Sequence, residues 1–194
     1  MSHDTVAHRI VRPLVRPLVG TSVRPNHLTL LRFATGLAAA AAFAKGGQGP
    51  VALGAAIFLV SSLLDRADGV LARLSGHMSP LGHRLDLISD CSSNALAFCG
   101  LGWGARAGWL QGWSPLLGVL AAVGVVTLFW QVNGLGRKAL PGAPARDGHV
   151  LFDPDDAIMA VPVLLWCVGA TPVLLLAGTI TPVLALWVSF RDRG

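Results

Sequence analysis

The 194-residue chain has little charge, since Asp, Glu, Lys and Arg together make up 13% of it while 53% of the residues are hydrophobic. Its mean hydropathy is +0.62. A soluble domain of this length needs more polar surface than this composition supplies. The composition therefore argues against a soluble enzyme and indicates a single all-α domain that crosses a membrane several times.

Other absences narrow the possible functions. The cysteines Cys91, Cys99 and Cys167 stand alone in apolar runs, with neither metal-ligand spacing nor a disulfide framework, and we interpret them as packing residues. No nucleic-acid-binding motif is present, so the net charge of +5 indicates loops that face anionic lipid. The N-terminal arginines are not followed by a cleavable hydrophobic region, and we expect no signal peptide.

Apolar segments of about 20 residues, the length that crosses a bilayer, recur along the chain. We predict a six-helix bundle over residues 26–190 as one domain. The spans are expected at about 26–44, from just after Pro50 to 74, at 82–103 and 114–133, and as two helices within 155–190. We place the last division near Gly169 and Pro172, because proline suits a turn or the first position of a helix. One long helix over 155–190 is the alternative.

Lys and Arg are unevenly divided between the two sides of this layout. The outer loops hold only Lys45 and Arg106, and the other loop cations fall on the inner side. This asymmetry predicts that both termini and the 76–82 connection face the cytoplasm. Residues 1–25 form a basic juxtamembrane segment expected on the membrane surface, or alternatively a plain positive-inside anchor. Pro13 and Pro17 argue against one regular helix there.

Four aspartates lie in the stretch DRADGVLARLSGHMSPLGHRLDLISD, residues 65–90. Asp65 and Asp68 are three residues apart on one face of the second predicted helix, and Asp86 and Asp90 are four apart on the third. A short turn joins these two helices as an antiparallel pair. The four carboxylates can therefore converge near the cytoplasmic end.

So many acids in a low-dielectric site repel one another unless cations are bound. A site made only of carboxylates suits Mg²⁺, Mn²⁺ or Ca²⁺. A proton relay and structural ion pairs with Arg66, Arg73 or Arg84 are the alternatives. We favour a metal site, because clustered intramembrane acids on adjacent helices indicate function.

Small residues and an arginine accompany the acids. Gly69, Ala72 and Gly82 would let a bulky ligand approach the backbone, and Gly82, near a helix N-terminus, could offer N–H groups to phosphate. Arg73, one turn beyond Gly69, could bind a phosphate bidentately. Small residues in spans more often serve helix packing. Together with a metal, however, these residues indicate a substrate that carries a pyrophosphate.

The pattern Asp65-x-x-Asp68-Gly69-x-x-Ala72-Arg73, then Gly82-x-x-x-Asp86-x-x-x-Asp90, resembles the signature of the class I CDP-alcohol phosphotransferase (CDP-alcohol phosphatidyltransferase) family. All eight defining positions are present at the family's spacing. The run Arg24-Pro25-Asn26-His27-Leu28-Thr29, with Arg32 after it, resembles the family's entry into the first span. The resemblance covers about residues 8–130.

The resemblance implies a membrane enzyme, commonly a homodimer, whose active site faces the cytoplasm from the inner membrane. It implies transfer of a phosphatidyl group from a CDP-alcohol, most often CDP-diacylglycerol, to an acceptor alcohol, with release of CMP, in phospholipid biosynthesis. By position, Asp65, Asp68, Asp86 and Asp90 would hold Mg²⁺ or Mn²⁺, two ions by expectation, and Asp90 would be the general base. The CDP moiety would be held by Asp65, Asp68, Gly69, Ala72, Arg73 and Gly82, with Asn26 and Thr29 at the rim.

The acceptor stays open at this point. Arg84, Arg137 and Lys138 are candidates for contacting a phosphorylated acceptor, although loop cations are ordinarily positive-inside charges. The lysine that often follows the fourth aspartate in glycerophosphate-using members is replaced by Cys91, which disfavours that acceptor. The alternatives are a CDP-choline-, CDP-ethanolamine- or CDP-inositol-type donor, or a cation or proton transporter that uses the acid cluster.

Overall fold

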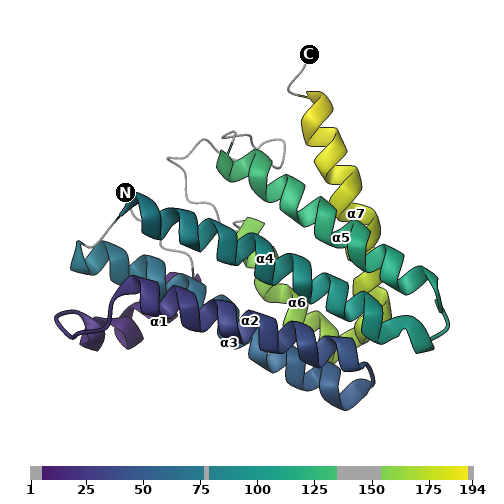
Figure 1. Ribbon diagram of the computed structural model, residues 1–194, viewed down its shortest axis with the longest axis horizontal. Coiled ribbons are helices and arrows are strands. Elements are labelled where there is room, and N and C mark those ends of the chain that lie inside the picture. Colours follow the sequence, from purple (N-terminus) through teal and green to yellow (C-terminus); the bar gives the residue numbers. More distant parts are fainter. Residues whose placement is uncertain (1–5, 77–78, 135–153, 192–194) are drawn as a thin grey trace.

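The computed structural model describes residues 6–76, 79–134 and 154–191, and this part of the chain contains seven α-helices and no strand (Figure 1). Short turns follow three of the helices: 3₁₀ turns at Arg16–Leu18 and Ala105–Ala107, and a π-helical turn at Trp130–Gly134. The helices are α1 (Val6–Val15), α2 (Pro25–Lys45), α3 (Gln48–Ser75), α4 (Pro80–Gly104), α5 (Trp113–Phe129), α6 (Pro154–Val168) and α7 (Ala170–Arg191). The expected all-α fold is confirmed.

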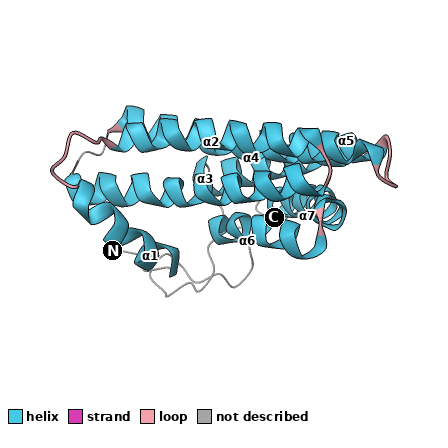
Figure 2. Cartoon of the chain, turned by 90° about the horizontal axis from the view of Figure 1, so that it is seen from below, coloured by secondary structure: helices cyan, strands magenta, loops and turns pink. Residues whose placement is uncertain are grey.

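Helix α2 is the centre of the packing. Helices α3 and α4 both pack along α2 rather than along one another, α5 packs on α4, α7 on α5, and α6 on α3. Figure 2 shows α3 and α6 below the layer that contains α2, α4 and α5. Apolar side chains fill the contact between α2 and α3, where the Phe43 and Phe58 rings lie 6.3 Å apart. Side chains of α3 and α4 can therefore meet only around α2.

The connection between α3 and α4 is short and capped at both ends. Gly76 ends α3 with a φ of 69°, in the left-handed region that glycine adopts without strain. Ser79 caps α4 by accepting a hydrogen bond from the Gly82 amide at 3.0 Å, and Pro80 takes the first helical position. Helix α4 thus begins two residues before the expected start at Gly82.

Two other helix boundaries bear on the sequence predictions. Gly169, with a φ of 83°, separates α6 from α7, so the single long helix over 155–190 is wrong. Helix α3 begins at Gln48, two residues before Pro50 and earlier than expected. A proline is tolerated there because the N–H groups of the first turn have no hydrogen-bond partner within the helix, so the missing N–H of Pro50 costs nothing.

The N-terminal segment is not one regular helix, in agreement with the expectation from its prolines. Helix α1 contains Pro13 close to its end, and the chain leaves the helix after Val15. Val11 and Val15 are buried against Val70 and Leu71 of α3, whereas Arg12 is exposed. Its place on a membrane surface stays a prediction.

Four helices are long and apolar enough to cross a membrane within the described residues. They are α2, α3, α7, and α5 with its extension to Val132. Helix α4 has sufficient length, but its first half carries Arg84, Asp86 and Asp90, and α6 has 15 residues, or about 22 Å. The chain is thus a helical membrane protein, and the six-span layout with both termini inside stays a prediction.

Glycines bring the backbones of the central helices into close contact. A Cβ atom on Gly100 of α4 would overlap the carbonyl oxygen of Ala40 on α2, and one on Gly102 would lie 2.9 Å from the Cα of Gly118 on α5. Small residues of this kind let membrane helices approach until their backbones touch.

We therefore expect Gly100→Ala to destabilise the protein by about 1–3 kcal/mol, the usual range for overpacking. Gly49→Ala is the matched control, because nothing lies within 4 Å of a Cβ at that position of α3. Thermal unfolding in detergent, followed by size-exclusion recovery, compares the two variants. Equal melting temperatures would contradict the proposed role of Gly100.

Candidate active site

Three of the four aspartates form a compact carboxylate cluster. Asp65 and Asp68 extend from α3 and Asp86 from α4, and each places an oxygen within 4.8 Å of the other two. Asp68 is buried, and the other two are partly exposed. Three carboxylate oxygens at this spacing fit Mg²⁺ or Mn²⁺, which prefer hard oxygen ligands. The cluster that the sequence predicted is therefore present for these three residues.

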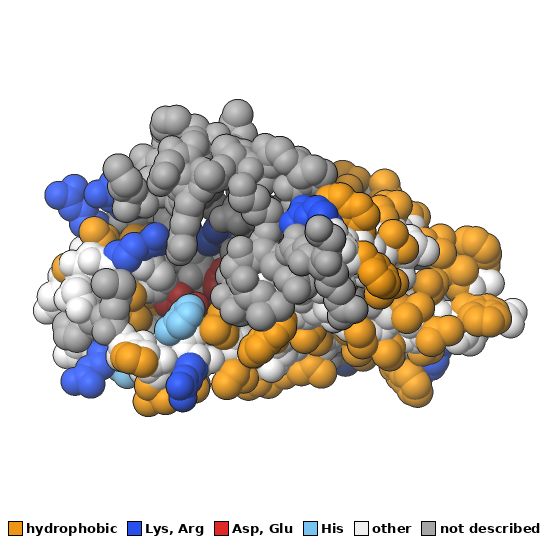
Figure 3. Space-filling model, turned by 90° about the horizontal axis from the view of Figure 1, so that it is seen from above, with side chains coloured by type: hydrophobic (Ala, Val, Ile, Leu, Met, Phe, Trp, Pro, Cys, Tyr) orange, Lys and Arg blue, Asp and Glu red, His pale blue; other side chains and the backbone are white. Residues whose placement is uncertain are grey.

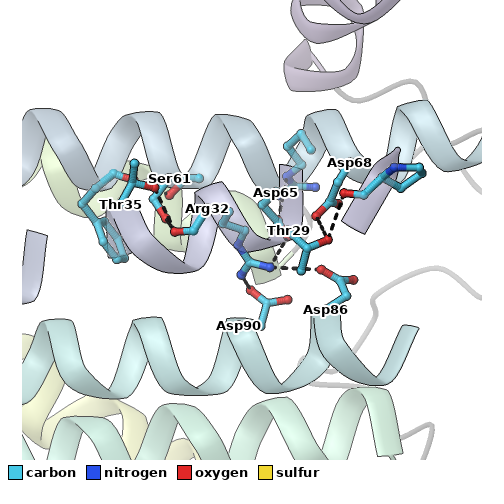
Figure 4. Close-up of polar contacts among 12 residues, drawn as sticks. Thr29, Arg32, Thr35, Ser61, Asp65, Asp68, Asp86 and Asp90 are labelled. Carbon is cyan, nitrogen blue, oxygen red and sulfur yellow. Dashed lines mark hydrogen bonds and ion pairs between the residues drawn. The ribbon is translucent and has the colours of Figure 1, made fainter. Parts of the chain in front are cut away.

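Thr29 of α2 fixes the orientation of the buried acid. Its hydroxyl donates to Asp68 Oδ2 at 2.8 Å (Figure 4). Thr29 itself is 5% exposed, one turn into α2 after Pro25. The sequence placed Thr29 at the rim of a CDP site, whereas in the structure it supports a candidate metal ligand.

Asp90 lies outside this cluster and contacts Arg32. The Arg32 guanidinium extends from α2 between the two helices that carry the acids (Figure 4). Its Nη1 lies 2.9 Å from Asp65 Oδ1 and 3.0 Å from Asp86 Oδ1, while its Nη2 contacts Asp90 Oδ1. One cation that is 3% exposed thus connects three of the four acids.

Arg32 was not among the predicted site residues. The available signal was an arginine seven residues into an apolar helix and three residues after Thr29, which puts both on one face of α2. Because intramembrane cations require a partner, that position could have been linked to the acids. The choice of partners depends on how α2 is rotated between α3 and α4, which no local pattern determines.

The remaining residues expected to hold the CDP moiety lie at two places, one where α2 and α4 begin and one on α3. A Cβ atom on Gly82 would lie 3.1 Å from Asn26 Oδ1, so the starts of α2 and α4 adjoin there. On α3, the exposed Arg73 donates from Nε to the carbonyl of Gly69 at 3.0 Å, and Ala72 is partly exposed. The Gly82 amide donates to Ser79 Oγ, so the cap of α4 competes with a phosphate for this N–H.

Of the three candidates for acceptor binding, the structure describes Arg84 alone. Arg84 is exposed on α4, and Arg137 and Lys138 lie outside the described residues. A cation that the acceptor prediction did not include lies beside the acids: Arg66 is buried, with its Nε 4.0 Å from Asp65 Oδ2. It borders a cavity of about 20 Å³, roughly the size of one water molecule, together with Asp90, Ser62, Asn94 and Met159.

Charge gathers at one end of the molecule. Figure 3 shows Lys and Arg side chains there, a hydrophobic surface toward the other end, and acidic side chains visible in a hollow beside a histidine. An apolar surface with a charged hollow at one end is expected of a membrane protein whose polar site is open to water. Fold and site together define a helical membrane protein with a carboxylate centre suited to a divalent metal.

Sequence comparison assigns the family. The profile described as CDP-alcohol phosphatidyltransferase matches residues 22–190. The chain belongs to the CDP-alcohol phosphatidyltransferase family, as its residue pattern predicted.

Two curated relatives share part of the chain. The archaetidylinositol phosphate synthase of Pyrococcus horikoshii is 32% identical over 113 residues, which are 57% of this chain and 58% of that protein. The bifunctional IPC transferase and DIPP synthase of Rubrobacter xylanophilus is 34% identical over 122 residues, 62% of this chain and 27% of that protein. The matched region therefore spans less than two thirds of either relative.

The fold also matches solved structures. The phosphatidylinositol phosphate synthase of Mycobacterium tuberculosis with CDP-DAG bound has a TM-score of 0.67 at 21% identity, covering 94% of this chain and 91% of that one. The same enzyme with manganese and citrate has a TM-score of 0.63 at 21% identity, covering 93% and 88%. At this identity the likeness concerns the fold.

The contact between Thr29 and Asp68 gives a test of the cluster as a metal site. Thr29→Val keeps the shape of the side chain but removes the hydroxyl that orients Asp68, and we expect about tenfold weaker Mn²⁺ binding. Thr29→Ser keeps the hydroxyl and should bind Mn²⁺ nearly as the unchanged protein does. Calorimetric titration of the purified protein measures both. Equal Mn²⁺ affinities in the two variants would show that the Thr29 hydroxyl does not contribute to metal binding.

Proposed function

We propose that the protein transfers a phosphatidyl group from a CDP-alcohol, with CDP-diacylglycerol as the donor, to the hydroxyl of an acceptor alcohol and releases CMP. The observation that carries this proposal is the Asp65–Asp68–Asp86 cluster on the family's signature positions. The mycobacterial homologue, solved with CDP-DAG, supports the choice of donor. We place the enzyme in the inner membrane as a homodimer, with its site facing the cytoplasm.

The charge of the site supports a requirement for divalent metal. The guanidinium of Arg32 contacts three of the four carboxylates and that of Arg66 lies 4.0 Å from Asp65, while a bound pyrophosphate would add about two further negative charges. Mg²⁺ or Mn²⁺ at the cluster would neutralise the pyrophosphate and stabilise the charge that develops on the CMP leaving group. Two ions, as the sequence predicted, would bring this total close to neutrality.

The protein's own groups have separate tasks in this proposal. Asp65, Asp68 and Asp86 would bind the divalent metal, and the Thr29 hydroxyl orients Asp68. Gly69, Ala72, Gly82 and Asn26 border the space for the CDP moiety, and Arg73 can swing from the Gly69 carbonyl to a phosphate. Asp90, apart from the cluster, accepts the proton of the acceptor hydroxyl as that oxygen attacks the β-phosphorus.

For the acceptor we propose a phosphorylated polyol. The buried Arg66 borders the same cavity as Asp90. In this proposal the acceptor places its hydroxyl at Asp90, so Arg66 is a nearby cation for the acceptor's phosphate. The names of the archaeal relative and the mycobacterial homologue both refer to inositol phosphate products. Arg84, Arg137 and Lys138 stay as further candidates for the same phosphate.

The first test replaces one ligand of the cluster at a time. Asp68→Asn or Asp86→Asn should lower CMP release at least about a hundredfold, because an amide cannot supply the negative charge that the metal needs. The assay contains purified protein, Mg²⁺ or Mn²⁺, CDP-diacylglycerol and a panel including inositol phosphate, glycerol phosphate and serine. Chelation by EDTA, reversed by added Mn²⁺, is the control. Near-normal turnover in either folded variant would refute the metal site.

The second test separates binding from chemistry. Asp90→Asn should abolish turnover while leaving the affinity for CDP-diacylglycerol within about threefold, because Asp90 acts on the acceptor. Loss of donor binding in this variant would make Asp90 a ligand of the donor complex. If the unchanged protein releases no CMP with any acceptor but moves ions across liposomes, the transport alternative holds instead.

A further inference from the structure

We propose that Arg32 is a built-in cation of the catalytic centre that holds Asp90 in place and competes with the metal for Asp65 and Asp86. This inference rests on the proposed metal site and adds a positioning residue to it. Arg32 contacts two members of the metal cluster with Nη1 and the separate Asp90 with Nη2. The two nitrogens of one planar group therefore serve acids with different roles.

The backbone around Arg32 is fixed independently of the acids. Its carbonyl oxygen accepts hydrogen bonds from Ser61 Oγ of α3 at 2.9 Å and from Thr35 Oγ1 at 2.8 Å (Figure 4). Ser61 is buried and ties α2 to α3 at this level. Because the Arg32 backbone is held in this way, the guanidinium can move among the three acids only by rotation about its side-chain bonds.

The shared oxygens make the competition specific. Nη1 lies against Asp65 Oδ1 and Asp86 Oδ1, on the two residues that together with Asp68 offer oxygens within 4.8 Å. A divalent cation there would repel the guanidinium across a few ångströms of poorly screened space. Metal binding must therefore weaken the Nη1 contacts, while Nη2 can keep Asp90.

The second proposed role of Arg32 is to hold the Asp90 carboxylate in position. A planar guanidinium fixes both the direction and the distance of a carboxylate, which an ammonium group does not. Through Oδ1, this contact holds Asp90 beside Arg32 and apart from the metal cluster. Arg32 therefore acts through Asp90 and does not itself need to touch the acceptor.

The test compares Mn²⁺ affinity with turnover in Arg32→Gln. We expect Mn²⁺ to bind about tenfold tighter or more, since a repelling charge is gone. Turnover at saturating Mn²⁺ should fall about a hundredfold, since Asp90 is no longer oriented. A residue with only a structural role would weaken both. Unchanged or weaker Mn²⁺ binding overturns the competition, and unchanged turnover overturns the positioning of Asp90.

Two further variants complete the design. Lys45→Gln removes the same charge from the same helix about 20 Å away and should change neither quantity. Arg32→Lys keeps the positive charge but loses the planar group whose two nitrogens contact different acids. Mn²⁺ affinity should therefore stay within about threefold, while turnover drops. If Arg32→Gln does not fold, as thermal unfolding will show, Arg32→Lys still decides the role toward Asp90: full turnover refutes it.

The binding measurement is independent of the proposed reaction, because it needs Mn²⁺ and protein but no substrate. If the unchanged protein binds Mn²⁺ but releases no CMP, the transferase proposal fails and the Arg32 comparison still stands. If the protein transfers phosphatidyl groups normally but Arg32→Gln binds Mn²⁺ no more tightly, the competition fails and the transferase stands.

Discussion

The cost of placing negative charge inside a membrane protein constrains this structure more than any other factor. A carboxylate in a low-dielectric region is costly unless a cation or hydrogen-bond donor compensates it. Here four acids share one region; Arg32 and Thr29 of α2 between them contact all four, and Arg66 of α3 lies 4.0 Å from Asp65. The central helix α2 thus stabilises the charges of its two neighbours, which explains why the acids gather around it.

The packing of the helices follows from the same requirement. Arg32 can reach acids on both α3 and α4 only if α2 lies between them and both helices approach closely. Glycines such as Gly100 allow the backbones of α2 and α4 to touch, and the Ser61 hydroxyl ties α3 to the Arg32 carbonyl. Small residues far from the chemistry therefore set the distances at the site. Because the acids and their partners all stand on packed helices, the distances among them are set by helix packing.

What the sequence could predict depended on local geometry. The spacing of Asp65, Asp68 and Asp86 along two helices follows from the helical period, so their convergence was predictable. The division at Gly169 followed from chain-breaking residues. Arg32 and the separation of Asp90 from the cluster were not predictable in this way, because both depend on the rotation of α2 between α3 and α4. Pro50, in the first turn of α3, removes no helical hydrogen bond, whereas Pro13 lies two residues before α1 ends.

The asymmetry of the site argues for an order of events in the proposed reaction. The Nη1 side of Arg32 faces Asp65 and Asp86 of the metal cluster, whereas its Nη2 side faces Asp90. The small cavity is bordered by Asp65, Arg66 and Asp90, so it touches both sides. A metal and a pyrophosphate would gather on the first side and an acceptor hydroxyl on the second. Attack in line with the departing CMP requires the nucleophile and the leaving group on opposite sides of the phosphorus. Arg32 stands at the boundary, so displacement of its Nη1 by metal would open the path between the two sides before the acceptor reacts.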